Sequence, residues 1–220
     1  AREKCAQEGA PLTITAQEKL ERISSSLDGQ VFKYRGRGPY HLRLLGEYQL
    51  LNALTVIDVC NALRSRGWDR LTDEAIDLGL SAAQWPGRLE LLRRRPDFIV
   101  DGAHNPQCVD ALMDSLAALY GDKKLIFLTG VLRDKDWQQM LRRALPLAKA
   151  FVVITPPSAR ALDENELAAW LNAQGVQAIP ARDTDDGVRR ALELAGEDDA
   201  ICSWGSLYFT GEVRRVLTEH

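Results

Sequence analysis

FIVDGAHNPQCVDALMDSLAALYGDKKLIFLTG, residues 98–130, holds the pattern that decides the fold. It begins with a short apolar run at 98–100 and ends with a second one at 125–128. Between them lie apolar residues at spacings 3, 4, 7 and 10, which form one stripe on a helix: Val109, Leu112, Met113, Leu116 and Leu119. Asn105 is the expected N-cap, and Pro106 suits the first turn because its missing N–H has no helical partner there. The stretch predicts a strand, a helix and a second strand.

The same rhythm continues to the end of the chain. Further short apolar runs occur at 151–154, 176–179 and 200–202, each followed by a segment with helical spacing. Runs without polar alternation suit strands that are buried on both faces, as in a parallel sheet. Asp163 begins the third helical segment as a capping-box variant with Glu166. Five strand–helix repeats predict a doubly wound α/β domain with a mostly parallel sheet over residues 86–220.

Residues 1–85 lack this rhythm. They hold a helix end, a loop with a possible strand at Leu12-Thr13-Ile14, and glycine-rich stretches at 28–45 that suggest hairpin strands. A helix of about 20 residues is expected to follow, with its apolar face starting at Leu50 and its end at Gly67, and then a short helix near 73–80. With few strands and no evident way to close a sheet alone, this half is expected to be the closing portion of a domain whose beginning is missing.

Composition excludes several classes of protein. The 220 residues carry 28 Lys and Arg against 31 Asp and Glu, a net charge of −3, which argues against a dedicated nucleic-acid surface. No apolar run approaches the roughly 20 residues of a membrane span. The four cysteines are scattered without a C-x-x-C pair, so reduced thiols in a cytoplasmic protein are expected rather than disulfides or a zinc site.

The candidate site comes from the loops that follow the strands, because ligands of open α/β sheets bind beyond the carboxyl ends of the strands. The first loop, residues 101–106, combines Asp101, His104 and a helix N-cap. Residues 203–207 are small and hydroxylated ahead of a helix, residues 129–136 are charged, and residues 85–88 form a turn that ends in Arg88. Helix capping and a solvated charged loop explain the same residues without a ligand. The chain has no G-x-x-x-x-G-K-[ST], G-x-G-x-x-G or G-x-S-x-G motif.

Five segments together resemble the folylpolyglutamate synthase/dihydrofolate synthase family of the Mur ligase superfamily. They are LGEYQLLNA at 45–53, WPGRLE at 85–90, DGAHNP at 101–106, GVLRDKD at 130–136 and GSLY at 205–208. The order and spacing match from about residue 40 onward. The resemblance implies a Rossmann-like carboxyl-terminal Mur ligase domain at 86–220. It also implies that residues 1–85 close a central ATP-binding domain whose P-loop and magnesium ligands lie in an absent amino-terminal part.

The resemblance implies roles for five residues. Asn52 corresponds to an adenine-contacting asparagine, Arg88 to an arginine that reaches the nucleotide, and Asp101 to an acid near the ribose. His104 is implied near ATP or the incoming glutamate, and Asp101 and His104 are the candidate catalytic residues. Ser206 corresponds to a serine implicated in glutamate binding, with simple N-capping as the alternative. Lys135 and Asp136 lie in a family motif without a derivable role, and Trp204 departs from the Cys-Gly-Ser that is frequent in the family.

The function implied is ATP-dependent ligation of L-glutamate to folate or dihydropteroate through an acyl phosphate, with Mg²⁺ held in the absent part. No metal ligand is expected in this chain, and no nucleic acid or membrane partner. A cytoplasmic monomer is expected, and the isolated chain is expected to be inactive. Two alternatives remain open: a stand-alone, non-catalytic nucleotide-binding module, and another Mur-type amino-acid ligase.

Overall fold

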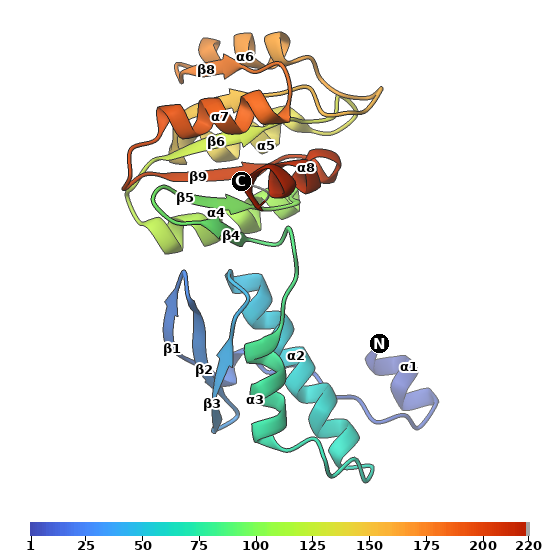
Figure 1. The fold of residues 1–220 in the computed structure, drawn as a ribbon. Coiled ribbons are helices and arrows are strands. Elements are labelled where there is room, and N and C mark those ends of the chain that lie inside the picture. The colour runs from blue at the N-terminus through green and yellow to red at the C-terminus, as the bar shows by residue number, and fades with distance from the viewer. Residues whose placement is uncertain (219–220) are drawn as a thin grey trace. The chain divides into compact units, whose positions relative to one another are not determined.

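The computed structural model describes residues 1–218, and the chain divides after Gln84 into two units. Within the described part of the second unit, a mixed sheet has the strand order β4-β5-β9-β6-β7-β8 (Figure 1). The strands are β4 (Glu90–Arg93), β5 (Asp97–Val100), β6 (Leu125–Thr129), β7 (Ala148–Val153), β8 (Ala178–Pro180) and β9 (Ala200–Trp204). From β5 to β8 in this order all neighbours are parallel, whereas β4 pairs antiparallel with β5. The doubly wound, mostly parallel sheet is confirmed.

Helices cover both faces of this sheet. They are α4 (Pro106–Tyr120), α5 (Trp137–Ala144), α6 (Glu164–Ala173), α7 (Thr184–Leu194) and α8 (Leu207–Thr218). The contacts of α4 with α5, and of Trp137 on α5 with Trp170 on α6, place these three helices on one face. The helices α7 and α8 pack together on the other face (Figure 1). The handedness of the crossovers explains this arrangement. Parallel crossovers are right-handed, so those that run from β5 through β6 and β7 to β8 place their helices on one face. The crossover from β8 back to β9 runs in the opposite direction along the sheet and places α7 on the other face.

The predicted helix caps are present. The Asn105 side chain accepts a hydrogen bond from the Cys108 N–H with Pro106 in the first turn, and Asp163 accepts from Asn165 and Glu166. The core on the α7/α8 side contains Phe98, Ile126, Val152 and Ile201 from four neighbouring strands, packed against apolar residues of the two helices. Every residue of β6 and β9 is buried, as the apolar runs predicted.

The first unit has a small sheet of its own. Strands β1 (Leu20–Ser26), β2 (Gly29–Tyr34) and β3 (Arg37–Leu42) form an antiparallel meander. The helices α2 (Glu47–Arg64) and α3 (Asp73–Ala82) share its core, which includes Phe32, Tyr40, Leu54 and Ile57. A short helix α1 (Arg2–Gln7) and the 3₁₀ turn η1 (Gln17–Lys19) precede the sheet, and a second 3₁₀ turn, η2 (Leu145–Leu147), follows α5.

Two strand expectations for the first 85 residues need correction. No strand forms at Leu12–Ile14 in the structure, and the first strand is β1, which the sequence did not indicate. Every β1 residue after Leu20 is exposed, so it carries no apolar alternation to mark it. The unit also closes a three-stranded sheet from its own residues, contrary to the expectation that it had no evident way to do so.

Candidate functional site

Three loops meet at the carboxyl edge of the central strands in the second unit. They are residues 101–105 after β5, 129–131 at the end of β6 and 203–206 at the end of β9. The Asp101 N–H donates to the Ser203 carbonyl and the Gly205 N–H to the Ala103 carbonyl, both at 2.8 Å. The Thr129 hydroxyl donates to the Trp204 carbonyl, also at 2.8 Å. These backbone-directed bonds fix the loops relative to one another, which is the scaffold that a binding site needs.

Gly205 allows two of these loops to approach closely. Its φ is +119°, and a Cβ at this position would lie 2.6 Å from the Gly130 carbonyl oxygen and 2.7 Å from Thr129 Oγ1. Both obstacles are held in place, since one is backbone and the other is hydrogen-bonded. Only glycine fits this position without opening the edge of the sheet.

The segment Trp85–Leu89 forms a turn beside this edge. The Arg88 N–H donates to the Trp85 carbonyl at 3.2 Å, with Pro86 second and Gly87 third at φ +71°, the signature of a type II turn. Leu89 follows at φ +44° and is 1% exposed. A left-handed conformation costs a leucine about 1–2 kcal/mol, so the neighbouring contacts must hold it there.

Asp101 supplies one of those contacts. Its Oδ2 accepts a hydrogen bond from the Leu89 N–H at 2.8 Å, and its Oδ1 accepts from the Ala103 N–H at 2.7 Å. The residue is 4% exposed. A hydrogen bond to a charged group contributes about 1.5–3 kcal/mol, enough to offset the cost at Leu89. Asp101 therefore fastens the turn 85–89 to the loop after β5.

Arg88 lies over Gly102 in this arrangement. A Cβ at Gly102 would be 2.7 Å from Arg88 Nη1 and 2.3 Å from Leu207 Cδ2, and the Gly102 N–H donates to the Gly87 carbonyl at 2.8 Å. The arginine is half-buried, yet its guanidinium makes no hydrogen bond or ion pair with residues 1–218. A partly desolvated guanidinium with unused donors is suited to an anionic ligand.

His104 follows in the same loop and is half-buried. Its Nδ1 lies 2.9 Å from the Gly102 carbonyl oxygen. Because a carbonyl only accepts, Nδ1 carries the proton, and the neutral ring keeps its lone pair on Nε2. The loop thus selects the tautomer in which Nε2 accepts a proton.

Ser206 lies at the start of α8 and is 2% exposed. Its Oγ accepts a hydrogen bond from the Tyr208 N–H at 3.2 Å, which agrees with the capping alternative and leaves the hydroxyl proton available. The preceding Trp204 is fully buried and packs edge-on against Phe127 at 6.1 Å, so the tryptophan forms the layer beneath the loops and not their surface. Ser203 Oγ and Trp204 Nε1 are both buried without a hydrogen-bond partner in the described chain.

The structure thus brings together four of the predicted residues: Arg88, Asp101, His104 and Ser206. Asn52 belongs to α2 in the first unit, where it is exposed and its Nδ2 donates to Gln49 Oε1 at 3.1 Å. In the charged loop after β6, Asp136 caps α5 by accepting from the Gln139 N–H. Lys135 is half-buried and makes no ion pair with the described residues.

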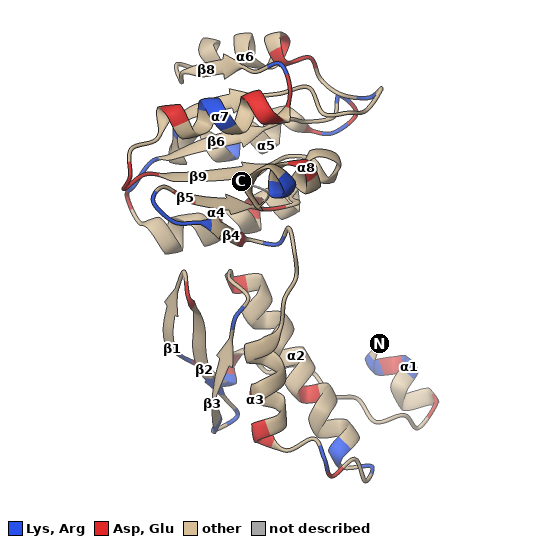
Figure 2. Ribbon diagram, in the orientation of Figure 1, with Lys and Arg blue, Asp and Glu red and all other residues tan. Residues whose placement is uncertain are grey.

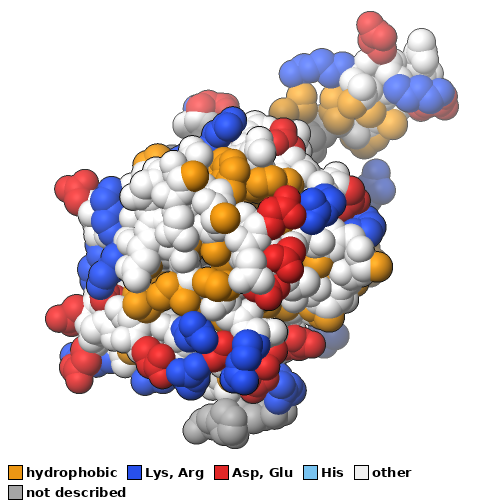
Figure 3. Space-filling model, turned by 90° about the horizontal axis from the view of Figure 1, so that it is seen from above, with side chains coloured by type: hydrophobic (Ala, Val, Ile, Leu, Met, Phe, Trp, Pro, Cys, Tyr) orange, Lys and Arg blue, Asp and Glu red, His pale blue; other side chains and the backbone are white. Residues whose placement is uncertain are grey.

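Charged side chains of both signs lie close together on the part of the surface that can be seen in Figure 3. On the face shown in Figure 3, acidic and basic side chains are intermingled, and along α7 acidic, basic and acidic residues follow one another (Figure 2). Among residues 1–218, no three His, Cys, Asp or Glu side chains are grouped as metal ligands. No helix of the described residues is long and apolar enough to cross a membrane.

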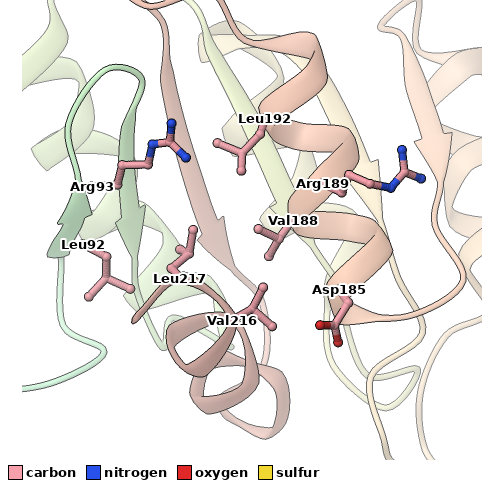
Figure 4. Close-up of a pocket in the computed structure, with 8 residues that line it drawn as sticks. All are labelled: Leu92, Arg93, Asp185, Val188, Arg189, Leu192, Val216 and Leu217. Atoms are coloured by element: carbon pink, nitrogen blue, oxygen red, sulfur yellow. The ribbon is translucent and has the colours of Figure 1, made fainter. Parts of the chain in front are cut away.

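A separate groove of about 530 Å³ lies between β4, α7 and α8 (Figure 4). Val188 and Leu192 of α7 face Val216 and Leu217 of α8 across it. None of the predicted site residues lines this groove, and its apolar walls continue the core beneath. It is therefore distinct from the site at the carboxyl edge.

Sequence reasoning missed two contributors to the site. Thr129 holds the end of β9 through its hydroxyl, and Glu90, which stands in the WPGRLE segment, bonds back to the turn: its Oε2 accepts from the Gly87 N–H at 2.8 Å. The position of Glu90 shortly after the Gly-Arg pair was a usable signal, because a carboxylate three residues after a turn amide can reach it.

Comparisons with known proteins show the family to which the second unit belongs. Residues 87–207 match the family described as Mur ligase, glutamate ligase domain. The chain is 34% identical over 187 residues to a dihydrofolate synthase/folylpolyglutamate synthase of Mycobacterium tuberculosis, covering 81% of this chain and 38% of the relative.

Solved structures show the same similarity. The structure of M. tuberculosis folylpolyglutamate synthase complexed with ADP and AMPPCP superposes with a TM-score of 0.81 at 26% identity, over 98% of this chain and 51% of that one. A bifunctional folylpolyglutamate synthase/dihydrofolate synthase with Mn, AMPPNP and L-glutamate bound gives a TM-score of 0.71 at 26% identity, over 99% and 50%. The chain thus spans about half the length of these structures, and it belongs to the Mur ligase family through its glutamate ligase domain.

Proposed function

We propose that the chain is the carboxyl-terminal half of an ATP-dependent ligase that adds L-glutamate to folates, to dihydropteroate, or to both. The observation that carries the proposal is the convergence of Arg88, Asp101, His104 and Ser206 at the carboxyl edge of a glutamate ligase domain. The relatives support it, since their names are folylpolyglutamate and dihydrofolate synthases and their structures hold adenine nucleotides and L-glutamate.

The reaction would proceed in two steps. The γ-phosphoryl group of ATP is first transferred to the folate carboxylate, which gives an acyl phosphate and ADP. The glutamate amine then attacks the acyl carbon, the new C–N bond forms, the bond from carbon to the phosphate oxygen breaks, and the amine loses its proton. Catalysis of such steps rests mainly on positioning the groups and stabilising negative charge.

Each predicted residue has a role that its contacts permit. The guanidinium of Arg88, which has no partner among residues 1–218, would stabilise the phosphate charge, and a planar fork suits phosphate oxygens better than an ammonium does. The Nε2 lone pair of His104 would accept the proton of the glutamate amine, because the bond from Nδ1 to Gly102 fixes that tautomer.

Ser206 would donate its hydroxyl proton to a glutamate carboxylate at the start of α8, where the helix dipole also favours an anion. Asp101 would orient the turn 85–89 and the loop after β5 beside the ribose, through its bonds to the Leu89 and Ala103 N–H groups. Asn52 would donate to and accept from the adenine edge with its amide.

Several expectations from the resemblance stay predictions. No metal-ligand group is found among residues 1–218, so we assign no step to a metal on this chain and propose that Mg²⁺ is bound by residues outside it. We also propose that the complete protein works as a cytoplasmic monomer, with the first unit as the closing part of an ATP-binding domain.

The test is nucleotide binding by residues 1–220. We expect calorimetry to detect ADP binding that Arg88→Ala weakens by about 10- to 150-fold, the equivalent of one charge-assisted contact. Arg93→Ala is the matched control, because Arg93 is exposed, lies in β4 and makes no ion pair with the described residues. Equal effects of the two substitutions would contradict the assignment of Arg88.

A ligation assay distinguishes the proposed function from the two alternatives, a non-catalytic nucleotide-binding module and another Mur-type ligase. The chain alone should release phosphate from ATP only at background level, because it has no phosphate-binding loop motif. Joined to the part of the M. tuberculosis relative that it does not match, it should consume ATP and incorporate glutamate. Nucleotide binding without ligation in a folded fusion would favour the non-catalytic module, and incorporation of a different amino acid would favour another Mur-type ligase.

A further inference from the structure

Glu90 links the turn that carries Arg88 to the helix α8, which begins directly after Ser206. Its Oε2 accepts from the Gly87 N–H at 2.8 Å, and its Oε1 accepts from Arg214 Nε on α8 at 3.2 Å. The Glu90 side chain is 22% exposed and that of Arg214 is 44% exposed. Both oxygens of one carboxylate are therefore used, one on each structural element.

Among residues 1–218, Glu90 is the hydrogen-bond acceptor of the Gly87 N–H, and no second acceptor is bonded to it. Gly87 is buried, and its carbonyl is already bonded to the Gly102 N–H at 2.8 Å. A buried N–H without an acceptor is unfavourable, so the turn would have to open to let water reach it. Opening the turn moves Arg88, which is the next residue.

The ion pair between Glu90 and Arg214 links the turn 85–89 to α8, the helix that follows Ser206. The helix α8 begins at Leu207, directly after Ser206, and carries Arg214 two turns later. A Cβ at Gly87 would also lie 3.2 Å from Thr210 Cγ2 on the same helix. The turn with Arg88 and the helix with Ser206 at its start are thus fastened together by Glu90.

We propose that Glu90 is a positioning residue that holds the Arg88 guanidinium ready for an anionic ligand, through Gly87 and with Arg214 as its anchor. This inference rests on the proposed function of Arg88 in nucleotide binding. Glu90 does not touch the ligand in this account. It keeps in place a turn whose left-handed Leu89 would otherwise relax.

The test is a double-mutant cycle on residues 1–220 with ADP as the probe. Glu90→Ala should lower ADP affinity about tenfold when Arg88 is present and leave it unchanged in the Arg88→Ala background, because a positioning effect passes through Arg88. Glu90→Gln keeps an oxygen for the Gly87 amide but loses the charge that pairs with Arg214, so it should lower affinity only about threefold. Glu193→Ala is the control, since it removes an exposed ion pair with Arg189 on α7.

Each outcome of the cycle either supports or overturns the positioning role of Glu90. The same loss of affinity in both backgrounds, or no loss in either, would overturn the inference. If Glu90→Ala does not fold, Glu90→Gln is taken through the same cycle with the same criteria. If the wild-type chain binds no ADP, the proposed function fails, and amide exchange at Gly87 then tests the clamp alone. Faster exchange in Glu90→Ala than in Glu193→Ala would support the clamp, because only Glu90→Ala removes the acceptor of the Gly87 amide, and equal exchange would overturn it.

Discussion

Gly102→Ala tests the position of Arg88 without changing any functional group. The new methyl group would lie 2.7 Å from Arg88 Nη1 and 2.3 Å from Leu207 Cδ2, where carbon atoms in good contact are about 3.5–4.0 Å apart. The third neighbour, the Gly87 carbonyl oxygen at 3.4 Å, needs little movement. Both close neighbours are ends of flexible side chains, so the side chains move while the backbone stays.

The expected magnitude follows from these distances. Leu207 is 53% exposed and can turn into solvent, whereas Arg88 is half-buried and must shift by about 1 Å. If the shift forfeits half of a charge-assisted contact of about 1.5–3 kcal/mol, ADP affinity should fall between about 3- and 13-fold. Overpacking at this site should lower the free energy of unfolding by about 1 kcal/mol.

The assay is calorimetric titration with ADP together with urea unfolding. Gly211→Ala is the control, because Gly211 lies in α8 of the same unit and its added methyl group would have no neighbour within 4 Å. That substitution should leave ADP affinity unchanged and raise stability by about 0.5–1 kcal/mol. Wild-type ADP affinity in Gly102→Ala would refute the placement of Arg88 in the binding site.

Three further predictions concern other parts of the second unit. The Arg182 N–H and the side chains of Arg189 and Arg190 hold the pKa of buried Asp186 far below its usual range. A carboxylate whose pKa is lowered by folding stabilises the fold above its unfolded pKa of about 4, and this stabilisation is lost as the pH falls further. Asp186→Asn should therefore cost about 1.5–3 kcal/mol in urea unfolding at neutral pH and progressively less below about pH 4, and a difference that does not change with pH would contradict this. Burial raises the pKa of the Cys202 thiol, so a thiol reagent should modify exposed Cys108 in the native chain and Cys202 only after unfolding, and rapid native modification of Cys202 would show that β9 is accessible. Arg88→Ala should weaken ADP binding more than Lys135→Ala, because Arg88 lies over Gly102 in the loop after β5 and its planar guanidinium fits phosphate oxygens better than an ammonium does; the reverse order would assign the nucleotide contact to the loop after β6.

The sequence predicts best the strands that are buried on both faces. The runs at 98–100 and 125–128 are apolar without alternation because helices cover both sides of the sheet, so burial alone marks them. Strands β1 and β4 escaped prediction for the opposite reason. Most β1 residues are exposed, and the four residues of β4 are at most half-buried at the edge of the sheet.

The sequence is sufficient to predict which loops form the candidate site. Parallel strands bring their carboxyl ends to one edge, so the sequence order of 101–105 and 203–206 implies that they meet. The roles of single groups depend on contacts that no local pattern contains. Glu90 reaches Arg214 across 124 positions of sequence, and only the structure shows that the Arg88 guanidinium has no partner among residues 1–218.

An ADP titration of the ¹⁵N-labelled chain followed by NMR tests the central claim most directly. We predict that the amide shifts that change will gather in the turn 85–89 and in the loops 101–105 and 203–207, together with the Arg88 side-chain Nε signal. Changes confined to the groove around Val188 and Leu217, or no changes at all, would contradict the account that this edge of the sheet binds the nucleotide.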